Sequence, residues 1–166
     1  MTQPTEDIFR EQPVDIEALR KEVKDDIPDT IRDVIRKHNQ MLTFINKYEE
    51  DIDALTPFKI SKLQYYYNKA EREAWKLAGY FKSQYQYYYG KASTERGQFY
   101  IYERETNKVT VNDSNYRSKV QEGINQEISG IYEGHYVTWK GIATSYAGAM
   151  LTMKDMIKAI DKEGGS

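Results

Sequence analysis

The feature that most constrains the fold is a long run of helical periodicity over residues 57–91. Apolar and tyrosine side chains recur there at spacings of three and four, which places them along one stripe of an α-helix. Thr56 and Pro57 suit the N-cap and the first helical turn. The stretch therefore predicts a long amphipathic helix with one packed face. That face comprises Ile60, Leu63, Tyr67, Ala70, Ala74, Leu77, Phe81, Tyr85 and Tyr88.

The remaining surface of this predicted helix combines basic and tyrosine side chains. Cations neutralise phosphates, and tyrosine rings offer flat surfaces on which unpaired bases stack. The pattern is typical of a surface for single-stranded DNA, although solvated lysines and half-buried tyrosines produce the same pattern. The candidate DNA-binding residues are Lys59, Lys62, Tyr65, Tyr66, Lys69, Arg72, Lys76, Tyr80, Lys82, Tyr87, Tyr88 and Lys91.

Charge is distributed unevenly along the 166 residues, whose overall net charge is only -2. Residues 1–57 contain 8 basic and 14 acidic side chains, whereas residues 58–96 contain 8 basic and 3 acidic ones. Residues 97–166 are nearly balanced, with 8 basic and 9 acidic side chains. Because a polyanion responds to the local field, the middle segment is the expected docking region.

The N-terminal third predicts two acidic helices within residues 15–57, preceded by a flexible arm over residues 1–14. Asp15 is placed to cap a short helix that runs to Lys24. Pro28 fits the first turn of a second helix, which we expect to continue until just before Pro57. Residues 15–166 are expected to form a single helical domain that associates with further copies.

Beyond Gly90 the periodicity changes from the helical repeat to an alternating pattern. Apolar and polar side chains alternate in residues 98–103 (QFYIYE), which are rich in strand formers. Residues 109–111 (VTV) could form the second strand, with a turn at residues 106–108. The pattern predicts a β-hairpin over residues 98–112. An isolated hairpin is only marginally stable, so we expect it to pair with another chain's hairpin or to lie on a helix.

Residues 114–161 predict a long C-terminal helix capped by Asp113 or Ser114. Its expected apolar stripe comprises Tyr116, Val120, Ile124, Ile128, Ile131, His135, Trp139, Ile142, Tyr146, Met153, Ile157 and Ile160. Glycine inside a helix costs up to about 1 kcal/mol relative to alanine, so five glycines in register favour close approach of another backbone. Kinks or loop breaks are the alternative explanation. The candidate oligomerisation residues are Gly123, Gly130, Gly134, Trp139, Gly141, Ile142, Tyr146 and Gly148.

Several function classes find little support in the sequence. The chain has no cysteine, so disulfides and cysteine zinc sites are excluded, and a reducing cytoplasm is the expected location. Carboxylates at residues 25–33 match no calcium loop, and His38 and His135 lack the paired partners of a zinc site or a catalytic triad. No glycine-rich phosphate loop is present. We expect no cofactor, no metal, no membrane span and no enzymatic activity.

The order of these segments resembles the UvsY family, the recombination mediators of T-even-like bacteriophages. The family tract reads approximately basic-x-basic-x-x-Tyr-Tyr-x-Gly-basic, and residues 82–91 here read KSQYQYYYGK. Lys82 and Lys91 match its basic positions, but Gln84 replaces the second one. The segments IEALRKEVKDDI and MLTMKDMI also look like family sequence, and the similarity extends from about Ile16 to Ile160.

This resemblance implies a ring-like homo-oligomer in the cytoplasm of an infected bacterium. Its implied partners are single-stranded DNA, the phage single-stranded-DNA-binding protein and a RecA-class recombinase, which it would load onto covered DNA in recombination, replication and repair. The expected fold is mainly α, with one small β-hairpin before the C-terminal helix, completed by homo-oligomerisation. The alternative from composition is a non-enzymatic helical scaffold that acts through protein contacts.

Overall fold

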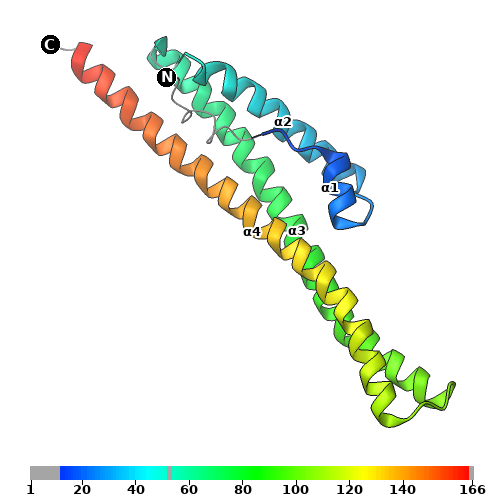
Figure 1. Ribbon diagram of the computed structural model, residues 1–166. Helices are drawn as coiled ribbons and strands as arrows, with labels where there is room; N and C mark the ends of the chain where they lie inside the picture. Colours follow the sequence, from blue (N-terminus) through cyan, green and yellow to red (C-terminus); the bar gives the residue numbers. More distant parts are fainter. Residues whose placement is uncertain (1–11, 52–53, 165–166) are drawn as a thin grey trace, which may run out of the picture.

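The computed structural model describes residues 12–51 and 54–164, which contain four helices (Figure 1). These are α1 (Ile16–Val23), α2 (Asp29–Glu49), α3 (Pro57–Glu105) and α4 (Val111–Gly164). Helices α3 and α4 form one long antiparallel hairpin, and α1 and α2 cover only the end of it that lies far from its loop (Figure 1). No helix in the described ranges is both long and apolar enough for a membrane crossing.

The starts of α1 and α3 confirm the caps predicted for them from the sequence. An Asp15 carboxylate oxygen accepts hydrogen bonds from the backbone N–H groups of Glu17 (2.9 Å) and Ala18 (3.2 Å). The Thr56 hydroxyl accepts from the Lys59 N–H at 3.3 Å, with Pro57 in the first turn of α3. Each cap satisfies backbone donors that a helix start leaves without partners. Helix α2 begins at Asp29. It ends at Glu49, before the predicted end next to Pro57.

The pairing of α3 and α4 follows a seven-residue repeat. On α4 every seventh residue from 118 to 153 is buried, which is the spacing of a left-handed coiled coil. The residues of this repeat are Ser118, Asn125, Tyr132, Trp139, Tyr146 and Met153. The large members lie in the half of α4 that α1 and α2 accompany.

The apolar core lies in that half, where α2 adds a third helix to the pair. Ile35 and Leu42 of α2 are buried against Leu63, Leu77 and their neighbours on α3, as the periodicity of both segments predicts. His38 is also buried here, and its Nε2 lies 2.8 Å from the Tyr146 hydroxyl. The ring of His38 meets Trp139 edge-on at 5.0 Å, so this histidine is a core residue.

The predicted β-hairpin over residues 98–112 is wrong. Helix α3 continues through Gly90 to Glu105, residues 106–110 form the connection, and α4 starts at Val111, earlier than the predicted caps. Extending an existing helix gains one hydrogen bond for each residue fixed, whereas an isolated hairpin must pair two strands without a third. Strand propensity depends strongly on context, and in residues 98–105 the continuation of α3 outweighs it.

The predicted apolar stripe of α4 is wrong at its N-terminal end. Tyr116, Val120 and Ile124 point outward with 71%, 54% and 51% exposure. Ser114, Ser118, Asn125 and Ser129 occupy the buried positions instead. Further along, Trp139, Tyr146 and Met153 are buried as expected. Pairing with α3 therefore places polar residues of α4 at the helix interface in the distal part of the hairpin. We call this distal part, residues 92–129, the arm.

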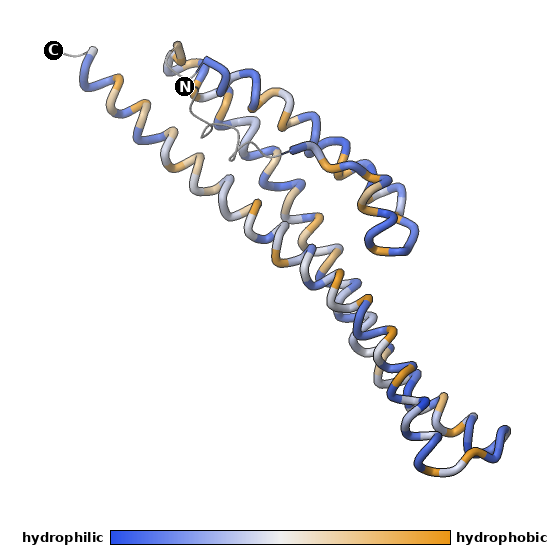
Figure 2. Tube along the Cα trace, in the orientation of Figure 1, coloured by the Kyte–Doolittle hydropathy of each residue, from blue (hydrophilic) through white to orange (hydrophobic). Residues whose placement is uncertain are grey.

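Inside the arm, charged side chains are paired across the two helices. The buried Glu103 accepts hydrogen bonds from Arg117 (2.8 Å) and Asn107 (2.6 Å). Glu95 accepts from Asn125 at 2.7 Å, and this bond is the main cause of its lowered pKa. Figure 2 shows hydrophilic residues interspersed with hydrophobic ones along this projecting end of the molecule. Polar pairs rather than an apolar core thus hold the arm together.

Candidate nucleic-acid interface

One outward row of α3 carries most of the predicted DNA-binding residues. Steps of three and four residues from position 58 to position 91 stay on the same side of a helix. Four of the ten side chains on this row are aromatic, five are basic and one is a serine, and none is acidic. We call the row the basic-aromatic stripe: Phe58, Lys62, Tyr65, Lys69, Arg72, Lys76, Tyr80, Ser83, Tyr87 and Lys91.

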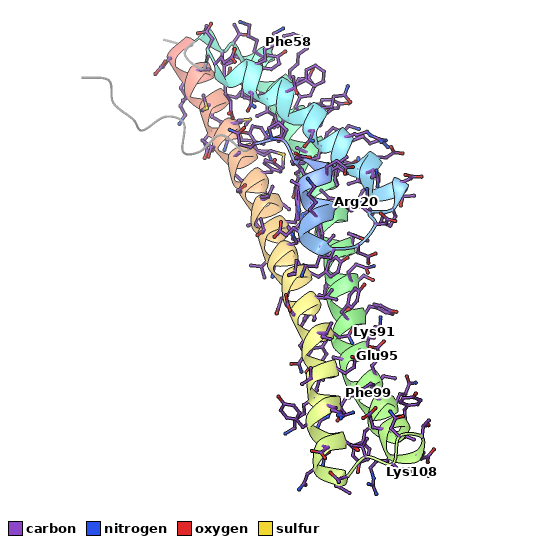
Figure 3. All side chains as sticks on the ribbon, turned by 45° about the vertical axis from the view of Figure 1, so that its right-hand side comes forward. Arg20, Phe58, Lys91, Glu95, Phe99 and Lys108 are labelled. Atoms are coloured by element: carbon purple, nitrogen blue, oxygen red, sulfur yellow. The ribbon has the colours of Figure 1, made fainter. Side chains whose placement is uncertain are left out.

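The stripe is straight and long. Thirty-three residue steps at about 1.5 Å each span roughly 50 Å along the helix axis. Figure 3 labels its two ends, Phe58 beside the start of α3 and Lys91 near the beginning of the arm. Phe58, Tyr65 and Tyr87 present exposed rings, with 68%, 57% and 59% exposure. An extended polymer can therefore follow the helix and meet several flat rings in succession.

Cations and rings of the stripe lie within reach of each other. The Lys62 ammonium lies 4.9 Å from the Phe58 ring centroid, and that of Lys69 lies 5.4 Å from the Tyr65 centroid. In the described part of the chain, no carboxylate is within ion-pair distance of Lys62, Lys69 or Arg72. Each of these cations is consequently available to a phosphate without first breaking an ion pair.

Two basic residues of the stripe are paired with carboxylates that flank it. Lys76 lies 2.8 Å from Glu73, and Lys91 lies 3.5 Å from Glu95. The Lys91 ammonium also lies 5.5 Å from the centroid of the Tyr88 ring. Exposed ion pairs contribute little free energy, so a phosphate can compete for these lysines, although less readily than for the unpaired ones.

Four of the predicted DNA-binding residues lie off the stripe. The Tyr66 ring stacks on Phe44 of α2 with centroids 4.8 Å apart. Lys59 lies on the same flank as α2 and donates to the Ala54 carbonyl at 3.4 Å. Lys82 turns the other way, toward α4, with its ammonium 5.8 Å from the Tyr136 centroid. The fourth, Tyr88, faces the α3–α4 seam.

Tyr88 belongs to a tyrosine cluster beneath the turn that follows α1. Its ring stacks on the fully buried Tyr132, with centroids 5.5 Å apart and planes inclined by 13°. Both hydroxyls donate to the same Asp25 carboxylate oxygen, at 3.1 Å from Tyr88 and 3.4 Å from Tyr132. Burial and the Asp25 charge together raise the pKa of Tyr88 to about 12, and they raise the pKa of Tyr132 as well. Tyr80 hydrogen-bonds to Tyr132 and connects the cluster with the stripe.

The sequence analysis missed Phe58, which is the most exposed ring of the stripe. Its spacing from Lys62 and Tyr65 puts it on the same row, so the periodicity contained the signal. Only Thr56 and Pro57 were assigned to the start of the helix, and Phe58 was given no role. A residue in the first turn can belong to the outward row, because the first turn of a helix has the same outward face as the turns that follow.

The predicted oligomerisation residues divide between the core and the outer surface. Trp139 and Tyr146 are buried and Ile142 is half-buried within this chain. The five glycines are exposed, and a Cβ atom built on any of them would meet no atom within 4 Å. No other segment of the same chain therefore packs closely against these glycines. Within one chain, nothing offsets the free-energy cost of placing glycine inside a helix. They are Gly123, Gly130, Gly134, Gly141 and Gly148.

The glycines lie on an outer face of α4 that is nearly free of charge. A helical wheel at about 100° per residue places them opposite the buried seven-residue repeat, with the exposed Tyr116, Val120 and Val137 close by. Lys119 and Glu127 are the charged residues that the wheel places on this face between positions 116 and 152. We call this the glycine face of α4.

This arrangement offers an elongated surface of cations and rings, without grouped donors for a metal in the described ranges. Cations and rings of this kind can neutralise phosphates and stack on bases. Comparisons with protein-family models, with curated proteins and with solved structures found no match for this chain.

Proposed function

We propose that the protein binds single-stranded nucleic acid along the basic-aromatic stripe and has no catalytic step. The observation that carries the proposal is the row of aromatic and basic side chains between Phe58 and Lys91, in which Ser83 is the one exception. Exposed rings accept bases of any sequence, and the unpaired cations accept phosphates. A duplex has its bases stacked inside and could use only the cations, so single strands are favoured.

The resemblance to UvsY extends this proposal to a recombination mediator. In that role the protein would assemble into a ring-like homo-oligomer and bind single-stranded DNA. It would also contact the phage single-stranded-DNA-binding protein and load a RecA-class recombinase. Several weak stripes on one assembly would engage one strand together and gain affinity by effective concentration, commonly by factors on the order of 10² to 10⁴. Such a gain allows competition for a strand that another protein already covers.

The first experiment titrates a fluorescent oligonucleotide with the protein at several salt concentrations. Each phosphate contact to a single strand contributes roughly -0.7 to the slope of log affinity against log salt. Alanine at Lys62, Lys69 and Arg72 together should therefore weaken binding and reduce the steepness of this slope by about 2. Affinity that is indifferent to salt would contradict the proposal.

A matched control removes the same charge elsewhere. Lys119, Lys140 and Lys154 are exposed residues of α4, away from the stripe, and their triple alanine variant loses three cations as well. It should keep the slope of the unchanged protein because these lysines are not placed to touch the strand. Equal losses in both triple variants would show that net charge rather than the stripe governs binding.

A scaffold without nucleic-acid binding is the second candidate, and the glycine face of α4 favours it. This face combines exposed apolar residues with small ones, as helix-packing surfaces do. The titration separates the two functions, since a scaffold would form assemblies without measurable affinity for oligonucleotides. Both properties can coexist, because the stripe and the glycine face belong to different helices.

A further inference from the structure

The turn that follows α1 places a carboxylate where a polyanion would otherwise find hydrogen-bond donors. Asp25 accepts hydrogen bonds from Tyr88 and Tyr132, which form the stacked pair at the inner edge of the stripe. A phosphate oxygen accepts from tyrosine hydroxyls in the same way as a carboxylate. Asp25 therefore occupies a position that suits a phosphate of a bound strand.

Helix α1 is short, and its flanks are tied to α2 by hydrogen bonds: Val14 exchanges two with the Asn39 side chain (2.9 Å each), and the Ile27 carbonyl accepts one from Arg32 (2.9 Å). The helix has eight residues, fewer than an isolated helix needs to be stable in water. Leu19, Val23 and Ile27 are the buried apolar residues of α1 and its turn, and Glu22 faces His135 of α4 at 3.3 Å. A further ion pair joins Lys24 to Glu127 at 3.8 Å, but both of these side chains are exposed.

Packing beneath α1 is also incomplete. A cavity of about 320 Å³ lies between α1 and α4, lined by Val14, Leu19, Trp139 and Ile142 among others. The buried His38 lines it as well, and its Nδ1 has no hydrogen-bond partner in the described structure. This pocket is open to solvent, so α1 and α4 make fewer side-chain contacts there than two closely packed helices would, and lifting α1 breaks fewer of them.

We propose that α1 and its acidic turn form a displaceable cover over part of the nucleic-acid site. In the free protein, Asp25 accepts the hydrogen bonds of Tyr88 and Tyr132 and keeps the turn over this pair. A bound single strand replaces Asp25 and gains the pair as an additional stacking surface. The inference rests on the proposed function, and it concerns the regulation of the same site.

Affinity for an oligothymidylate provides the first test. Asp25→Asn keeps the shape of the side chain but removes its charge. It should tighten binding by about tenfold, the effect expected from releasing a hydrogen bond to a charged acceptor. Tyr88→Phe keeps the ring but removes a hydroxyl that Asp25 and a bound phosphate would both use, so it should not reproduce this gain. Asp26→Asn is the matched control, because the neighbouring Asp26 pairs with Arg20 at 3.1 Å and touches no tyrosine. Equal effects of Asp25→Asn and Asp26→Asn would overturn the cover.

Tryptophan fluorescence provides the second test. Trp139 lines the cavity under α1 and is 5% exposed, whereas Trp75 is 46% exposed on α3. In a Trp75→Phe background the emission reports Trp139 alone. Saturating oligothymidylate should shift this emission to longer wavelengths as α1 lifts and water reaches the indole.

The outcomes separate the cover from the proposed function. Tight binding without a shift of Trp139 emission leaves the stripe as the binding site and overturns the cover. If the unchanged protein and the Asp25→Asn variant both fail to bind at low salt, both proposals are wrong. Binding that emerges only in Asp25→Asn would support the cover, since the closed turn would then block the site.

Discussion

At the scale of single residues, His38 shows how burial changes the chemistry of a side chain. Burial disfavours the charged imidazolium and lowers the pKa of His38 from the ordinary 6.5 to about 4. The neutral ring instead forms a hydrogen bond with the Tyr146 hydroxyl. What looked in the sequence like an unpaired histidine is a polar contact that links α2 to α4.

The depressed pKa of His38 predicts that stability falls as the pH is lowered. Above pH 6.5 the histidine is neutral in both states; below it the unfolded chain binds a proton that the folded chain does not. Between pH 7 and pH 5 the free energy of unfolding should fall by roughly 2 kcal/mol from this group. Urea denaturation at several pH values measures it.

The control for this prediction is His38→Gln, which offers Tyr146 a neutral polar partner. Its unfolding free energy should be lower overall but should vary much less between pH 7 and pH 5. Other groups would have to carry the pH dependence if the variant retained the full slope.

At the scale of elements, the arm is a two-helix hairpin whose interior is polar and whose exterior carries apolar side chains. Glu103 is 3% exposed and depends on Arg117 and Asn107 for its hydrogen bonds. Meanwhile Ile101, Tyr102 and Tyr116 are more than half exposed. Little apolar surface is buried here, so specific polar pairs determine the register of the two helices.

Arg117→Ala should loosen the tip of the arm. The change leaves the buried Glu103 carboxylate with Asn107 as its remaining side-chain donor, and a lost hydrogen bond to a charged group costs about 1.5–3 kcal/mol. The effect should be local, because a tip can open without unfolding the rest of the molecule. Hydrogen exchange of amides in residues 98–118 should therefore accelerate. Lys119→Ala removes a nearby exposed cation and should leave exchange unchanged; equal acceleration in both variants would contradict the role of the Glu103–Arg117 pair.

At the scale of the whole molecule, the hairpin has two chemically distinct outer faces. The stripe of α3 is basic and aromatic, and the glycine face of α4 is nearly uncharged. A division of this kind suits a protein that binds a polyanion with one helix and another copy of itself with the other. Self-association through α4 is the part of the proposed function that the glycine face supports.

Substitution of the exposed glycines tests self-association. An added Cβ meets nothing within the chain, so Gly134→Ala with Gly141→Ala should stabilise the monomer by up to about 2 kcal/mol through helix propensity. Bulkier leucine at both positions should instead reduce assembly, as measured by sedimentation, if a second backbone packs there. Gly97→Leu is the control, because Gly97 is also unobstructed but lies on α3. A micromolar monomer in the unchanged protein would refute the self-association outright.

Local signals in the sequence determined where α1 and α3 begin and which face of α3 is buried. Asp15 and the Thr56–Pro57 pair define helix starts because capping depends on neighbouring residues only. The three-and-four spacing from Ile60 to Phe81 also identified the packed face of α3 correctly. Once the packed face of α3 was identified, the outward stripe followed, because the residues that are not on the packed face lie on the other sides of the helix.

Only the tertiary structure decided the features that depend on a partner segment. Residues 98–105 alternate like a strand, yet they extend α3 because a helix was already present and α4 lay beside it. In the arm, the register places Ser118 and Asn125 inside and Val120 outside, which apolar periodicity alone could not reveal. Tyr65 and Tyr88 are chemically identical in the sequence, but the turn after α1 reaches only the second, through Asp25. Whether a tyrosine ring is free to bind a ligand or is packed in the core depends on which segment lies against it in the folded chain. That segment is distant in sequence, so the residues around the tyrosine do not reveal it.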